Sequence, residues 1–183
     1  MLLAAGIAFD VIIPSVDEEA VKAELLAENA APRAIADALA ELKALRVSTR
    51  YPDALVIGAD QVLVCEDRLF NKAADKVEAG KTLRALKGRK HQLVSAVVLA
   101  RNMRPIWRHV ESADLLMRDF SNAFLESYLS EEREAVLECV GCYRIEGRGV
   151  QLFDGIAGDQ FTIRGLPLLP LLAALRLNGA LVR

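Results

Sequence analysis

The strongest constraint on the fold is the continuous apolar run at residues 54–59, which ends at Asp60. A run of this length is typical of a strand with both faces covered by other elements. A second run at residues 93–100 has the same character, and a predicted turn at 101–105 connects it to a third strand at 106–117. Apolar residues also recur at helical spacing after Pro32, which predicts an amphipathic helix there. The chain therefore builds a core from both strands and helices.

Capping residues and turn signals extend this outline to the rest of the chain. Residues 7–13 have strand character, and Ser15 with Glu18 forms a capping-box pattern that predicts a helix to about residue 28. Further helices are predicted at 75–86, 121–129 and 167–177, and a further strand at 150–153. A strict β-α-β-α rhythm is missing from the middle of the chain. The pattern predicts an α/β fold with a mixed β-sheet flanked by helices, in a single domain over residues 1–183.

Composition excludes several classes of protein. The chain is 53% apolar with a net charge of −2, so it has no overall basic field for a nucleic-acid backbone and is unlike disordered sequences. No apolar stretch reaches the roughly 20 residues that span a bilayer, and the start lacks the basic region of a secretory signal. Three cysteines, an odd and sparse count, fit a reducing cytoplasm. We therefore expect a cytoplasmic protein with no nucleic-acid or membrane partner.

Two further features favour structural roles. Cys139 and Cys142 form a C-x-x-C, but the chain has no second pair and only two histidines, and the motif does not open a helix after a strand. Burial is therefore favoured over redox or metal chemistry. His91 precedes a strand, and no nucleophile elbow or zinc-protease motif accompanies it. We interpret His91 as a structural residue.

Three charged residues could serve phosphate chemistry. Asp60 follows a buried strand directly, where a carboxylate can hold a divalent cation or take a proton from water. Lys43 and Lys72 could place positive charge on phosphate oxygens. Each has an ordinary alternative, because Asp60 could be a turn residue and either lysine a solvated surface group. The residues alone leave both readings open.

Two glutamates are ambiguous in the same way. Glu18 could return a hydrogen bond to the backbone of Ser15 as part of the capping box, or it could bind metal or water near Asp60. Glu146 lies in a glycine-bearing segment where backbone can approach a ligand closely. Its alternative is a salt bridge to Arg144 or Arg148.

The order of these segments resembles the Maf family over nearly the whole chain. The residues that carry the resemblance are Val16-Asp17-Glu18, Lys43 in its alanine-rich helix, Gly58-Ala59-Asp60, Asn71-Lys72, Ile145-Glu146-Gly147 and Gly165-Leu166-Pro167-Leu168. Maf proteins are nucleoside triphosphate pyrophosphatases that resemble the inosine-triphosphate pyrophosphatase fold, use a divalent metal and commonly form dimers. The resemblance implies a nucleotide substrate, a Mg²⁺ or Mn²⁺ cofactor and a homodimer.

The resemblance also assigns residues. It implies that Asp60 is the proton acceptor, that Lys43 and Lys72 bind phosphate, and that Asp60 and Glu18 hold the metal. Gln61 and Glu146 fall where subgroups of the family differ in base preference, and this pair looks like the subgroup that hydrolyses 7-methyl-GTP. A glutamate can accept two hydrogen bonds from a guanine edge, as glutamine cannot do equally well. The same reaction on dTTP or UTP is the alternative.

One family feature is missing from this sequence. The family carries a serine- and arginine-rich loop, S-x-S-x-x-R, before its A-G-I segment, whereas here Met1 stands five residues before Gly6. We expect a domain truncated at its N-terminus: either Met1 is internal to a longer chain, or activity is severely reduced. A non-catalytic nucleotide-binding or division-linked protein is the rival interpretation that this departure motivates. Ala73 replaces a proline of the family, which is a smaller difference.

Overall fold

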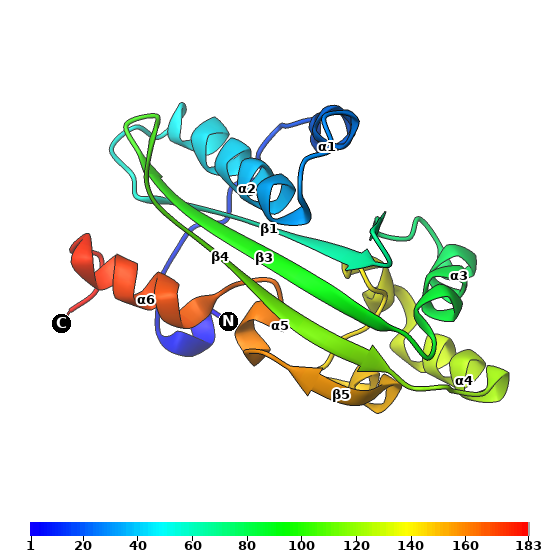
Figure 1. Cartoon of the computed structure of the whole chain (residues 1–183). Helices are drawn as coiled ribbons and strands as arrows, with labels where there is room; N and C mark the ends of the chain where they lie inside the picture. Colours follow the sequence, from blue (N-terminus) through cyan, green and yellow to red (C-terminus); the bar gives the residue numbers. More distant parts are fainter. Residues whose placement is uncertain (183) are drawn as a thin grey trace. The chain divides into compact units, whose positions relative to one another are not determined.

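The protein is built on a five-stranded sheet with the strand order β2-β1-β3-β4-β5, shown in Figure 1. The computed structural model describes residues 1–182. The strands are β1 (Val56–Cys65), β2 (Arg68–Phe70), β3 (Lys90–Arg101), β4 (Arg104–Met117) and β5 (Phe153–Ala157). β2 pairs antiparallel with β1, and β5 pairs antiparallel with β4. The predicted α/β class, a sheet flanked by helices, is confirmed.

The chain divides into two compact units, and each draws on separate stretches of sequence. Unit 1 contains Met1–Gln61, Ser95–Glu111 and the described residues from Gly165 onward. Unit 2 contains Val62–Val94 and Ser112–Arg164. The boundaries fall inside β1, β3 and β4, so each unit holds one part of these three strands. The single domain over residues 1–183 stays a prediction.

Unit 1 places helices on both faces of its strands. The helices are α1 (Glu18–Ala27), α2 (Pro32–Ser48) and α6 (Leu168–Leu177), preceded by the short 3₁₀ helix η1 (Leu3–Ala5). In Figure 1, α1 and α2 lie on one side of the strands and α6 on the other. α2 approaches β1 at Gly58, where a Cβ would collide with the backbone of Ala40 and Ala44. This close approach requires glycine, and it brings the next residues of β1 against α2.

Unit 2 surrounds its own hydrophobic core. Its helices are α3 (Lys76–Leu86), α4 (Asn122–Glu132) and α5 (Gln160–Ile163), with the 3₁₀ helices η2 (Arg133–Glu138) and η3 (Arg148–Leu152). Asp75 and Ser121 cap α3 and α4 through side-chain oxygens, as predicted from the sequence. The largest fully buried side chains of this core include Phe120, Leu125 and Tyr128.

Most predicted elements are confirmed, with four corrections. The first strand does not end before Asp60, because β1 continues to Cys65 and Asp60 lies within it. Residues 7–13 contain no strand, and several of their apolar side chains are exposed. The N-cap of α1 is Asp17 rather than Ser15, because its carboxylate accepts a hydrogen bond from the Ala20 amide at 3.0 Å. Glu18 is therefore the first residue of the helix and not the reciprocal partner of a capping box. The strand predicted at 150–153 is mostly η3, and β5 starts only at Phe153.

The structural interpretation of His91 agrees with its surroundings in unit 2. The ring is buried, and its Nε2 lies 2.8 Å from the hydroxyl of Tyr143. Burial lowers the pKa of His91 to about 4, although the nearby backbone of Arg89 opposes the shift. Nδ1 itself has no hydrogen-bond partner of good geometry among residues 1–182. This histidine is therefore neutral at pH 7 and packs as a core side chain.

The cysteines also have the surroundings of structural residues. All three are free thiols, of which Cys65 and Cys142 are buried and Cys139 is half-buried. Burial raises the pKa of Cys142 to about 11 and also raises the pKa of Cys139. Neither thiol is thus activated as a nucleophile at neutral pH. Within residues 1–182, no helix is both long and apolar enough to cross a membrane.

Candidate functional site

A three-residue charge cluster in unit 1 joins β1, α2 and α1. The ammonium Nζ of Lys43 donates to Oδ1 of Asp60 at 2.6 Å. The same Nζ lies 2.9 Å from Oε2 of Glu18. Three side chains that are separated in sequence therefore meet at one cation. The sequence analysis gave a place near Asp60 as one alternative for Glu18, and here both carboxylates lie beside Lys43.

The local fold explains why they meet. Successive strand residues point to opposite faces, so Asp60 faces the same way as Gly58, toward α2. On α2, Lys43 is one residue from Ala44 and three from Ala40, the residues that contact Gly58. The small side chains of this helix face bring the lysine close enough to reach the carboxylate. The side chains of Lys43 and Asp60 are only 19% and 11% exposed, which separates this pair from ordinary surface ion pairs.

Burial and pairing act against each other on the two central groups. Burial raises the pKa of Asp60 above its ordinary value and outweighs the opposing hydrogen bond and charge of Lys43. Burial alone would lower the pKa of Lys43, but the hydrogen bonds and charges of Asp60 and Glu18 together raise it. A carboxylate with a raised pKa is a better proton acceptor than a solvated one, provided that it stays ionised at the working pH.

Lys22 is a fourth charged residue near this cluster, and the sequence analysis did not identify it. It stands one helical turn after Glu18 on α1, so both project from the same face of the helix. Burial lowers the pKa of Lys22, and the charges of Asp60 and Glu19 oppose that shift. The i,i+4 spacing from Glu18 could have predicted the position of Lys22. It became informative only once the structure placed Glu18 close to Asp60.

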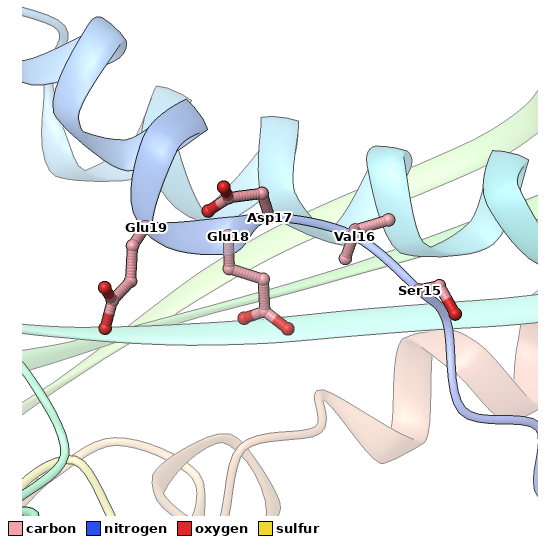
Figure 2. A pocket seen from close by; sticks show the side chains of 5 residues that line it. All are labelled: Ser15, Val16, Asp17, Glu18 and Glu19. Carbon is pink, nitrogen blue, oxygen red and sulfur yellow. The ribbon is translucent and has the colours of Figure 1, made fainter.

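The residues that lead into α1 line a shallow pocket in unit 1. Its lining consists of Ser15, Val16, Asp17, Glu18 and Glu19. Figure 2 shows the carboxylates of Glu18 and Glu19 projecting to the same side of the chain, toward β1, while Asp17 is turned to the first turn of α1. The two acidic residues have different roles at the start of the helix. Asp17 caps the backbone, so Glu18 is available to contact Lys43.

The donor set of this cluster fits a divalent cation that arrives with a phosphate ligand. Among residues 1–182, no group of three or more His, Cys, Asp or Glu side chains is arranged to hold a metal. The carboxylates of Glu18 and Asp60 nevertheless converge on a single cationic atom, Nζ of Lys43. Mg²⁺ is commonly held by one or two carboxylates, with waters and substrate phosphates completing its octahedron.

Gln61 lies in unit 1 but does not share the environment of Asp60. Strand alternation turns it to the opposite face of β1. Its amide Nε2 donates to the hydroxyl of buried Ser95 at 2.8 Å. On that face it neighbours Gly165, where a Cβ would lie 3.9 Å from the Gln61 carboxamide. The structure thus joins the G-A-D-Q and G-L-P-L segments through Gln61.

The two remaining candidates belong to unit 2. Lys72 is exposed in the loop between β2 and α3. Glu146 forms ion pairs with Arg144 and Arg164, so the predicted salt bridge to Arg144 is present, whereas Arg148 pairs with Glu131 instead. The charges of both Glu146 and Lys72 act on the thiol of Cys139. The sequence analysis discussed Cys139 only as a structural residue and did not connect it with these two candidates.

Known proteins are similar to this chain over nearly its whole length. The sequence pattern of the family described as "Maf-like protein" matches residues 1–177. A protein of Caulobacter vibrioides named "Nucleoside triphosphate pyrophosphatase" is 58% identical over 97% of this chain and 88% of its own length. A protein of the same name from Paramagnetospirillum magneticum is 54% identical over 100% of this chain and 94% of its own. The "7-methyl-GTP pyrophosphatase" of Rhizobium meliloti is 46% identical over 99% of this chain and 91% of its own.

Proposed function

The chain belongs to the Maf family, and on that premise we propose that it is a nucleoside triphosphate pyrophosphatase. It hydrolyses the bond between the α and β phosphates, with a nucleoside monophosphate and pyrophosphate as products. The observation that carries the proposal is the largely buried Asp60 carboxylate of β1, paired with Lys43, which also forms an ion pair with Glu18. A carboxylate and an ammonium held together in this way serve proton transfer and phosphate binding from one place.

In the proposed reaction, Asp60 accepts a proton from the water that attacks the α-phosphorus. The new P–O bond forms as the bond to the β-phosphate oxygen breaks, and pyrophosphate leaves with the electron pair of that bond. Lys43 holds Asp60 ionised before the reaction and offers its ammonium to phosphate oxygens as their charge grows. Lys72 keeps the phosphate-binding role that the family resemblance implies.

A divalent cation, Mg²⁺ or Mn²⁺, would be held by Asp60 and Glu18, and when bound it would neutralise phosphate charge and make water more acidic. The chemistry of the cluster supports such a cation. Glu18 and Asp60 both lie beside Lys43, and carboxylate oxygens are ligands that Mg²⁺ prefers. Glu18 reaches the cluster from a side chain that is 46% exposed, which leaves it accessible to solvent and ligand.

We propose 7-methyl-GTP as the substrate, with Glu146 as the residue that selects the base. Its carboxylate can accept hydrogen bonds from the N1 and N2 donors of guanine, and a cationic methylated ring favours a nearby negative charge. Relatives from Rhizobium meliloti and Brucella abortus with 46% and 47% identity are named for this substrate, which supports the choice. Hydrolysis of dTTP or UTP is the alternative within the same reaction.

The proposal is tested by pyrophosphate release from a panel of nucleotides in the presence of Mg²⁺ or Mn²⁺. We expect the highest kcat/KM for 7-methyl-GTP and near-complete loss of turnover in Asp60→Asn. A matched control is Asp67→Asn, which removes an exposed carboxylate from the turn between β1 and β2. Turnover of 7-methyl-GTP by Asp60→Asn at the parent rate would overturn the assignment of Asp60. A preference for UTP or dTTP would replace the substrate but keep the reaction.

A further inference from the structure

The carboxylate of Glu146 shares one oxygen between two arginines of unit 2. Nε of Arg144 lies 3.5 Å from Oε1 of Glu146, and Nε of Arg164 lies 3.8 Å from the same atom. The Glu146 side chain remains 35% exposed, so it is accessible to a ligand while both cations stand beside it. A carboxylate has about four lone-pair positions, and contacts centred on Oε1 leave acceptor capacity for the donors of a ligand.

Both arginines extend from backbone that is held in place. A Cβ on Gly149 would collide with the backbone of Arg144, so these two segments pack directly on each other. The amide of Gly147 also donates to the carbonyl of Arg144 at 3.2 Å. Arg164 ends the α5 turn, with its amide donating to the carbonyl of Gln160 at 3.2 Å. Two fixed attachment points thus direct their guanidinium groups to one acidic side chain.

The two arginines do not contribute equally to Glu146. Arg144 is also 4.0 Å from Glu132, so it divides its charge between two carboxylates. Among residues 1–182, Arg164 has one ion pair, which is the one to Glu146. Replacing Arg164 would therefore remove a charge that pairs with Glu146 and not with Glu132. It would disturb Glu132 less than replacing Arg144 would.

We propose that Arg164, with Arg144, is a positioning residue that sets base selectivity by holding the Glu146 carboxylate in one orientation. The proposal deepens the proposed function and rests on it for the role of Glu146. A hydrogen-bond acceptor discriminates between bases only when its direction is fixed, because a mobile carboxylate can follow either edge. The two guanidinium groups supply that restraint without occupying the whole carboxylate.

A competing role for Arg164 would be direct contact with substrate phosphate, and the two roles predict different kinetics. Phosphate is common to every nucleotide, so loss of an arginine–phosphate contact lowers kcat/KM for all substrates alike. If Arg164 positions Glu146, its replacement affects only the preference between nucleotides that Glu146 distinguishes. That effect disappears in Glu146→Gln, which lacks the charge that Arg164 attracts. A double-mutant cycle between Arg164 and Glu146 separates the two roles.

The experiment measures kcat/KM for 7-methyl-GTP and UTP in the parent, Arg164→Gln, Glu146→Gln and the double variant. We expect Arg164→Gln to lower the ratio of 7-methyl-GTP to UTP by about tenfold, and by less than about twofold in the Glu146→Gln background. Arg164→Lys should restore part of the ratio. Arg176→Gln, an exposed arginine of α6, is the control and should leave the ratio unchanged. The proposal would be overturned if Arg164→Gln lowered kcat/KM equally for both nucleotides. It would also be overturned if Arg164→Gln changed the ratio as much in the Glu146→Gln background as in the parent.

A binding measurement distinguishes failure of this inference from failure of the proposed function. Titration calorimetry with 7-methyl-GMP and UMP in the same four proteins requires no turnover. If the parent releases no pyrophosphate from any nucleotide, the proposed function fails, but the binding cycle still decides the role of Arg164. If the parent does not prefer 7-methyl-GMP, or if Arg164→Gln leaves that preference intact, the positioning role is wrong even in an active enzyme.

Discussion

Replacing Lys43 by Met should destabilise the protein, and a second replacement at Asp60 should restore the lost stability without restoring activity. Met keeps most of the lysine's length and apolar stem but removes the ammonium that lies 2.6 Å from Asp60. In Lys43→Met the Asp60 carboxylate, 11% exposed, is left without its partner beside Glu18. Asn at position 60 removes that uncompensated charge, so Lys43→Met/Asp60→Asn should fold nearly as stably as the parent.

The size of the effect follows from the burial of the pair. Removing one partner of a fully buried pair costs about 3–5 kcal/mol, whereas an exposed pair contributes about 0–1 kcal/mol. Side chains that are 19% and 11% exposed lie between these limits, and we expect a loss of about 2 kcal/mol for Lys43→Met. For a chain of this size, that corresponds to a fall in Tm of about 4–8 °C.

The dependence on pH has a definite sign. Burial already raises the pKa of Asp60, and loss of Lys43 removes the largest opposing contribution, so the pKa of Asp60 rises further. A carboxyl group whose folded pKa exceeds its unfolded pKa destabilises the fold above the folded pKa, and the penalty disappears below the unfolded pKa. The stability gap between parent and Lys43→Met should therefore narrow as pH falls from about 7.5 toward about 4.

Urea denaturation of the parent, both single variants and the double variant at several pH values measures this cycle, with pyrophosphate release measured in parallel. Activity should fall by about 100-fold or more in Lys43→Met and should not recover in the double variant. The reasoning is refuted if Lys43→Met is as stable as the parent at neutral pH. It is also refuted if the double variant is no more stable than Lys43→Met, because the charge of Asp60 would then not be the source of the loss.

Three further predictions concern His91, Lys22 and the divalent metal. Burial lowers the pKa of His91 to about 4, so the parent should lose about 3 kcal/mol of stability as pH falls from about 6.5 to about 4, and His91→Gln should flatten that dependence. The prediction is contradicted if the free energy of unfolding depends on pH as steeply in His91→Gln as in the parent. Lys22→Met removes a positive charge that acts on Asp60, so the acid limb of kcat/KM should move to higher pH; superimposable pH profiles would exclude Lys22 from the cluster. Chelation with EDTA should abolish pyrophosphate release. Glu18→Gln should raise both the Mg²⁺ concentration for half-maximal activity and the Mg²⁺ dissociation constant measured by calorimetry, by at least about tenfold. If the Mg²⁺ requirement of Glu18→Gln equals that of the parent, Glu18 does not hold the metal and only contacts Lys43.

Local signals predicted much of the fold because the physical causes are local. Pro32 at the start of α2 and the side-chain caps Asp75 and Ser121 act within a few residues of their own positions. The failures occurred where tertiary contacts decide. Residues 7–13 have the composition of a strand, but a strand also needs a partner edge, and no strand forms there. Ser15 was the predicted cap of α1, but the carboxylate of Asp17 accepts from the Ala20 amide, so the helix starts two residues later than predicted.

The charge cluster was predictable as a set of residues but not as an electrostatic arrangement. The order of segments indicated Asp60, Lys43 and Glu18, whereas the identity of the group at the centre of the cluster, Lys43, depends on the close approach of α2 at Gly58. Lys22 and Arg164 were outside the sequence analysis for the same reason. Each matters only through a neighbour that is distant in sequence or that was itself ambiguous.

Strand geometry gives adjacent residues separate ways to affect the reaction. Asp60 and Gln61 are consecutive, but β1 turns Asp60 toward α2 and Gln61 toward Ser95 and Gly165. The two side chains can therefore be replaced independently, although a single peptide bond joins their residues. If Gln61 influences base preference, it does so by way of the segment that begins at Gly165, since its amide already donates to a buried hydroxyl. The proposed proton acceptor and Gln61 thus lie on opposite faces of the same strand, which allows one to vary while the other stays fixed.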